Sequence, residues 1–156
     1  MEAKIRRTNH ITGELHDEVI TNNVIFPIDT DESVTFTSHA SANTFCAWAE
    51  IVDNNAVTLS SKFAAYHGHI TNIMVESNDG ADDAKFLYEL SYGAAKTLIR
   101  SGRCVSNGSG TTKETFQTVY GIGTEVPSGE TIYYRIKCST GGKLITVHLS
   151  YFIYVD

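Results

Sequence analysis

The chain has 156 residues, of which 42% are hydrophobic and 19% are charged, and its net charge is −6. This length and composition predict one globular domain and not a disordered chain, and the acidic balance argues against binding to nucleic acid. No run of about 18 apolar residues is present, so neither a membrane-spanning helix nor a membrane partner is expected. The polar start of the chain predicts no secretory signal peptide.

The first 23 residues show no alternation of apolar and polar residues, and they predict an extended N-terminal arm. Residues 1–10 carry three basic groups and one acid, 3 − 1 = +2, whereas the rest of the chain carries nine and seventeen, 9 − 17 = −8. This contrast favours a docking arm with Ile5, Arg6, Arg7 and His10 as partner-binding residues, and the alternative interpretation is a solvated tail.

From residue 24 onward, short stretches rich in Val, Ile, Thr, Tyr and Phe are separated by turn residues. Such stretches predict strands, and without a strand–helix–strand alternation they favour antiparallel pairing. The predicted fold class for residues 24–156 is therefore all-β, an antiparallel jelly-roll-like β-sandwich, with a barrel as the less favoured alternative. The expected strands comprise residues 24–28, 34–37, 44–53, 67–76, 86–92, 97–105, 115–122, 132–139 and 145–155, with a turn at residues 53–55.

The last two predicted strands show the clearest alternation. In residues 145–155 every odd position holds Ile, Val, Leu or Tyr, which predicts one core-facing side. Thr140, Gly141 and Gly142 separate the two strands, so we expect them to form an antiparallel hairpin.

Aromatic residues occupy the opposite side of these two strands, at Tyr133, Phe152 and Tyr154. A sandwich needs only one apolar face per sheet, so a second apolar face predicts an oligomer interface formed by these three residues. Two alternatives stay open: strand ends that reach both layers, and an aromatic platform that binds sugar.

His67 and His69 alternate along one predicted strand, so both imidazoles could reach one metal ion. The sequence is similar to the first cupin motif at these histidines only, because six residues separate His69 from the next acid, Glu76, where the motif has three or four. At the second motif, Ile132 and Ile136 stand where its histidine and asparagine are expected. We therefore expect no metal and no other cofactor, and interpret the histidines as part of an ordinary strand end or an interface.

The sequence contains no nucleophile elbow and no phosphate-binding loop with its lysine. Cys46, Cys104 and Cys138 are odd in number and too far apart for a zinc-binding pair, which predicts free thiols in a reducing cytoplasm. Arg103 could lower the pKa of Cys104, but no histidine is near it in the sequence. A non-enzymatic function is expected.

Two stretches resemble small structural proteins of tailed bacteriophages. The first is Asn-Thr-Phe-Cys-Ala-Trp-Ala-Glu-Ile-Val-Asp at residues 43–53, with residues 60–63 and 68–70, and the second is Val-Pro-Ser-Gly-Glu-Thr-Ile-Tyr-Tyr-Arg-Ile-Lys at residues 126–137 with the final strand. The resemblance covers residues 24–156 and implies a jelly-roll capsid decoration (cement) protein.

Membership of that family would imply a virion protein of the outer capsid surface, assembled in the host cytoplasm. It implies a homotrimer that clamps neighbouring subunits of the major capsid protein, with residues 1–23 reaching onto the shell. The alternative is a trimeric receptor- or carbohydrate-binding knob of a phage fibre or tail.

Overall fold

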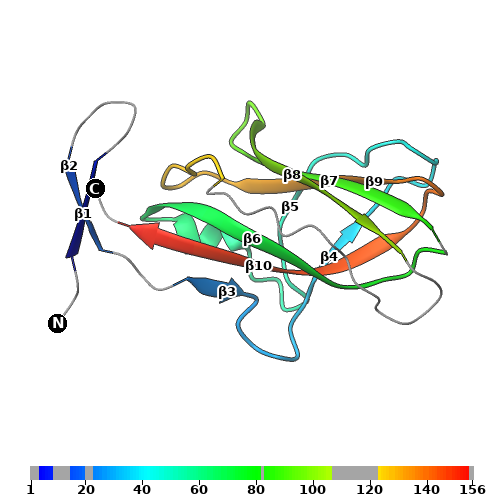
Figure 1. Ribbon diagram of the computed structural model, residues 1–156, viewed down its shortest axis with the longest axis horizontal. Helices are drawn as coiled ribbons and strands as arrows, with labels where there is room; N and C mark the ends of the chain where they lie inside the picture. Colours follow the sequence, from blue (N-terminus) through cyan, green and yellow to red (C-terminus); the bar gives the residue numbers. More distant parts are fainter. Residues whose placement is uncertain (1–3, 9–14, 20–22, 82, 107–122, 155–156) are drawn as a thin grey trace.

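The computed structural model describes residues 4–8, 15–19, 23–81, 83–106 and 123–154, and nearly all of their regular structure is β. Two antiparallel sheets pack against each other (Figure 1), which confirms the predicted all-β sandwich. The elements in chain order are β1 (Lys4–Thr8), β2 (Leu15–Val19), β3 (Val24–Phe26), β4 (Val34–Thr37), β5 (Ala49–Glu50), the short 3₁₀ helix η1 (Leu59–Phe63), β6 (His67–Asn78), β7 (Lys85–Tyr92), β8 (Thr97–Val105), β9 (Ile132–Cys138) and β10 (Leu144–Tyr154).

Strand β10 is the centre of one sheet, which we call the β10 sheet. Strand β6 pairs with β10 from Ile145 to Tyr154 along one edge. Because a strand has only two edges, β3 and β4 share the other edge one after the other. The second sheet has the order β5-β9-β7-β8, and we call it the β7 sheet.

The core lies between the two sheets, where the inward side chains of both interdigitate. Phe36 of β4 stacks on Tyr134 of β9, with ring centroids 4.0 Å apart and an interplanar angle of 12°. Burial of this kind stabilises the fold by about 1.5–3 kcal/mol for each large apolar side chain, and it raises the pKa of Tyr134. The fully buried side chains include Phe36, Phe63, Phe86, Ile51, Leu59, Ile70, Leu90, Ile132, Ile136, Ile145 and Leu149.

The predicted hairpin of the last two strands is wrong, although both strands exist. β9 pairs with β5 and β7, whereas β10 pairs with β3, β4 and β6. The link between them crosses from one sheet to the other: Gly142 N–H donates to His39 O at 2.8 Å, and Ser38 N–H donates to Lys143 O at 2.8 Å. Alternation shows that one side of a strand is buried, but either sheet of a sandwich can bury it.

Residues 44–53 form much less strand than expected. Cys46 N–H still donates to Ile136 O at 3.0 Å, but Ile136 N–H donates to the Cys46 thiol instead of to a main-chain carbonyl. This side-chain acceptor interrupts the regular ladder, so that only Ala49–Glu50 is a strand. The turn at residues 53–55 is confirmed, because Asp53 Oδ1 accepts hydrogen bonds from the main-chain N–H groups of Asn55 and Val57.

The structure also differs from the prediction before Val24, where we expected no strand. β1 and β2 pair antiparallel, from Lys4 opposite Val19 to Thr8 opposite Leu15, and form a two-stranded sheet of their own. In Figure 1 this hairpin stands beyond the end of the sandwich where β3 begins and β10 ends. Sequence alternation misses such strands because neither of them, Lys-Ile-Arg-Arg-Thr or Leu-His-Asp-Glu-Val, has a continuous apolar side. The expected strand at residues 115–122 lies outside the described residues.

Candidate functional site

Four ring-bearing side chains gather on the outer face of the β10 sheet, and we call them the aromatic–histidine cluster. Strand register places His67 opposite Tyr154 and His69 opposite Phe152. The ring centroids of His69 and Phe152 are 5.1 Å apart, and those of His69 and Tyr154 are 5.9 Å apart. Gly68 faces inward between the two histidines, where a Cβ atom would meet the ring of Phe63 at 2.8 Å.

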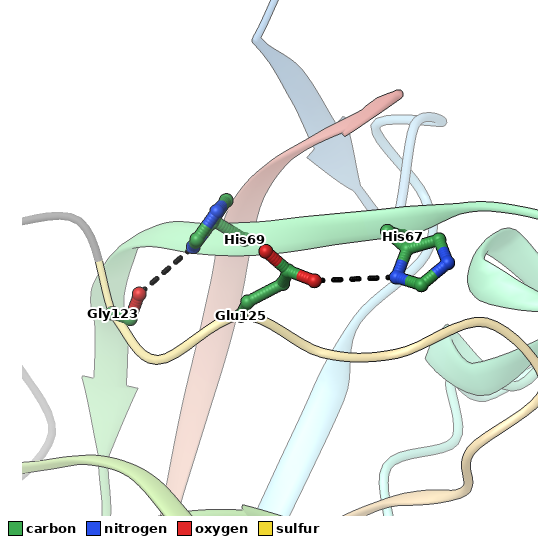
Figure 2. Close-up of polar contacts among 4 residues, drawn as sticks. All are labelled: His67, His69, Gly123 and Glu125. Carbon is green, nitrogen blue, oxygen red and sulfur yellow. Dashed lines mark hydrogen bonds and ion pairs between the residues drawn. The ribbon is translucent and has the colours of Figure 1, made fainter. Parts of the chain in front are cut away.

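The segment Gly123–Val126 runs beside the start of β6 and fixes both imidazoles (Figure 2). His67 Nδ1 lies 3.2 Å from Glu125 Oε1, and His69 Nδ1 lies 2.8 Å from the main-chain oxygen of Gly123. A carbonyl oxygen only accepts, so the proton of His69 is on Nδ1, and its Nε2 is the acceptor when the ring is neutral. Two different partners therefore orient the two rings.

The structure does not assemble the cupin-like ligand set. Glu76, the acid that follows the two histidines in the sequence, lies 3.0 Å from Nδ1 of His148 and does not join them. Within the described residues, no group of three or more His, Cys, Asp or Glu side chains is placed to hold a metal ion.

The three predicted interface residues are not brought together. Phe152 and Tyr154 lie on the outer face of the β10 sheet, whereas Tyr133 belongs to β9 and lies on the outer face of the β7 sheet. Tyr154 is only 6% exposed, and Phe152 is half-buried. The separation follows from the crossing of the chain between β9 and β10, which places the two aromatic stretches on opposite outer surfaces.

The outer face of the β7 sheet carries cations from three strands. Lys85, Arg103, Arg135 and Lys137 point away from the core, since their neighbours Phe86, Cys104, Ile136 and Cys138 are buried. We call these four residues the basic face. Glu89 is the one acidic residue in β7, β8 and β9, each of which the structure describes completely.

Aromatic rings lie among these cations. The Arg135 guanidinium lies over the rings of Phe45 and Trp48, 4.4 Å and 4.5 Å from their centroids, and its Nε is 2.7 Å from Glu89 Oε2. Lys96 Nζ lies 3.0 Å from the centroid of Tyr133. One side of each of these three rings is therefore in contact with a cation.

Sequence reasoning missed the basic face because its residues are far apart in the chain. Arg103 and Lys137 become neighbours only because both β8 and β9 pair with β7, where each of them lies opposite Leu87. Each residue can be read from the sequence as an outward position of a strand. Strand order is the missing information, and it is set by contacts distant in sequence.

Of the predicted partner-binding residues, Ile5, Arg6 and Arg7 lie on β1, and His10 lies outside the described residues. Main-chain register places Arg6 opposite Asp17 and Ile5 opposite Glu18. The basic strand is thus paired with an acidic one, and the hairpin's two strands carry three bases and two acids, 3 − 2 = +1.

All three cysteines are free. Burial, with a smaller contribution from the nearby Cys138, raises the pKa of Cys104 to about 12. The expectation that Arg103 could lower this pKa fails, because successive strand residues point to opposite faces and Arg103 lies in solvent. The Cys104 thiol is therefore not activated as a nucleophile.

No protein-family model matches the chain, and no curated protein matches it. In the part of the chain that the structure describes, no helix is long and apolar enough to cross a membrane.

Proposed function

We propose that this chain is a non-enzymatic structural protein of a virion, a decoration protein that binds the outer surface of the major capsid protein shell and stabilises it. The observation that carries the proposal is the architecture of the protein: a two-sheet sandwich with broad outer faces, and a separate N-terminal hairpin beyond one end of it. The resemblance of residues 24–156 to small phage structural proteins supports the same role.

Such a protein acts by shape and not by chemistry. A sandwich with a continuous core holds its outer surfaces at fixed positions, and several copies in one assembly multiply weak contacts through effective concentration. The hairpin adds contact length on the shell. Ile5, Arg6, Arg7 and His10 are the residues that we propose for this contact, with arginine able to bind shell carboxylates through two parallel hydrogen bonds.

The proposed oligomer is a homotrimer, with the outer face of the β10 sheet as its interface. Phe152 is half-buried there, and Met74 of β6 is 52% exposed on the same side of the sheet. Apolar side chains in such positions favour burial against a second chain. Light scattering of the purified protein at micromolar concentration is expected to give three times the mass of the chain, and a monomer that also fails to trimerise on a capsid would contradict the trimer.

The test of the capsid role is a comparison of the full chain with a variant lacking residues 1–20. The truncated protein should keep nearly all of its thermal stability, because terminal segments outside the core add little to it, and it should bind capsids more weakly. Binding of the full chain should also weaken with salt, as expected for exposed charges. If the truncated protein decorates capsids as tightly as the full chain, the sandwich alone makes the contacts.

A receptor- or carbohydrate-binding knob of a fibre or tail is the second candidate. Phe45 and Trp48 favour it, because both rings are only partly buried at the edge of the β7 sheet. Against it, the Arg135 guanidinium already lies over both rings. Quantitative gels of purified virions separate the two functions, since a decoration protein is present in many copies per particle and a knob in few.

A further inference from the structure

The basic face contains a hollow that the proposed trimer and the N-terminal hairpin leave unused. Its volume is about 300 Å³, and cations on three adjacent strands border it: Lys85 on β7, Arg103 on β8 and Lys137 on β9. Leu87 lies between Arg103 and Lys137 in the strand register and supplies an apolar surface. Asn43, Phe86 and Ser139 complete the lining.

These three cations have no acidic partner in the described part of the chain. Glu89, the one acid on the three strands, is bound to Arg135, 2.6 Å from its Nη2. Arg103 and Lys137 lie opposite Leu87 from the two strands that flank β7, and nothing in the fold requires a cation at these positions, since each side chain points away from the core. An anionic ligand would neutralise this group of like charges.

We propose that the hollow of the basic face is a docking site for an acidic segment of another protein. The planar guanidinium of Arg103 would bind a carboxylate through two parallel hydrogen bonds. Lys85 and Lys137 would neutralise neighbouring carboxylates as point charges. Leu87 would contact an apolar side chain next to them. The segment that fits therefore alternates Asp or Glu with apolar residues.

A protein segment fits the surface better than a nucleic acid does. The whole chain carries a net charge of −6, so its field opposes the approach of a long polyanion, whereas a short acidic segment is attracted locally. The apolar and aromatic neighbours Leu87 and Phe45 match protein side chains, and the cations form a compact group and not a track for successive phosphates.

This inference concerns a face other than the one proposed for trimerisation, and it does not depend on a role in a virion. The probe is a short synthetic peptide of alternating Glu and Leu, compared with a peptide in which Gln replaces every Glu. Titrated into the ¹⁵N-labelled full chain, the acidic peptide should produce saturable amide shifts at Leu87, Arg103 and Ser139. The Gln peptide should produce none.

Two double variants with the same change in net charge serve as test and control. Arg103→Glu with Lys137→Glu should weaken peptide binding by about tenfold or more, the effect expected when two charge contacts are reversed. Lys62→Glu with Lys143→Glu changes cations away from the hollow and should leave the affinity within about twofold. Unchanged amide spectra outside the substituted residues would show that both variants fold.

Three results would overturn the proposal. An equal loss of peptide affinity in the two double variants would mean that binding depends on the net charge of the protein and not on the hollow. Tighter binding of a single-stranded oligonucleotide than of the acidic peptide would assign the face to nucleic acid. A drop in the mass of the purified protein on introducing Arg103→Glu and Lys137→Glu would make a second copy of the chain the occupant.

Discussion

The two outer faces of the sandwich differ in how far they bury an outward-pointing tyrosine. Tyr154 points outward from the β10 sheet and is 6% exposed, with the rings of His67, His69 and Phe152 around it. Tyr133 points outward from the β7 sheet and stays half-buried under the Lys96 ammonium group. An outward position in a strand therefore does not define a surface residue, because neighbouring side chains can bury it outside the main core.

The largest effect on the free energy of unfolding is expected from a substitution on the inward side of β10, compared with one on its outward side. Leu149 is fully buried in the core, so Leu149→Asp would place an unpaired charge there. Most single substitutions lower the free energy of unfolding by about 0.5–3 kcal/mol. A buried charge without a partner costs more than that, so the domain should unfold. Circular dichroism and urea denaturation measure this loss.

Its matched control is Ser150→Asp, one residue further along the same strand on the outer side. This carboxylate can reach water in the single chain, and the free energy of unfolding should change by less than about 1 kcal/mol unless the proposed trimer buries the outer face of the β10 sheet. Equal tolerance of the two substitutions would mean that the register of β10 is shifted by one residue, since such a slip exchanges the two sides.

The next largest effect on stability is expected from removing the outward tyrosine of each outer face. Tyr154→Ala should lower the free energy of unfolding by about 2–4 kcal/mol, as expected for the loss of a large buried ring. Tyr133→Ala should lower it by less than about 1 kcal/mol, because that ring keeps contact with water and with one cation. If both variants lose the same stability in urea denaturation, the aromatic–histidine cluster is not a second site of burial.

The strands of the sandwich could be predicted from the sequence far better than their arrangement. Residues 34–37 form a strand with the predicted bounds, because buried Val34 and Phe36 alternate with outward threonines. Residues 97–105 also form the expected strand. The sheet to which a strand belongs could not be predicted, as β9 and β10 show. Sheet membership depends on pairings such as that of β6 with β10, which join residues far apart in the chain.

The candidate sites, too, could be predicted only where their residues lie within one strand. His67 and His69 stand out in the sequence because a single residue separates them on one strand, but their partners Glu125 and Gly123 are more than fifty positions away. The basic face was not predictable at all, since each of its strands contributes only one or two cations. Motifs within one strand are visible in the sequence, and sites built across strands need the strand order.

A third prediction concerns the side of β7 and β8 that faces the core beneath the basic face. Burial raises the pKa of Tyr88 to about 12 from 10.0, and the neighbouring Cys104 adds to the rise. The unfolded chain loses the phenol proton near pH 10, before the folded chain does, so the stabilisation is complete below pH 10 and is lost as the pH rises to about 12. The loss should approach about 2.7 kcal/mol for this group, at about 1.36 kcal/mol for each pKa unit.

The control for this titration is Tyr88→Phe, which keeps the ring and removes the ionisable group. Between pH 10 and pH 12 the free energy of unfolding of this variant should fall less steeply than that of the native chain. Parallel curves for the two proteins in urea denaturation would show that Tyr88 ionises alike in the folded and unfolded states.

The smallest effect is expected on the basic face, at the pair formed by Arg135 and Glu89. Both side chains are partly exposed, so solvent screens the ion pair, and its coupling energy in a double-mutant cycle with alanine should be about 0.5–1 kcal/mol. Arg135→Lys keeps the charge but loses the fork that holds Glu89 and the planar contact with Phe45 and Trp48. Trp48 is the single tryptophan of the chain, so its fluorescence should change in both Arg135→Lys and Arg135→Ala and stay unchanged in Lys62→Ala. A coupling energy near zero would show that the guanidinium is held by packing against the two rings and not by the carboxylate.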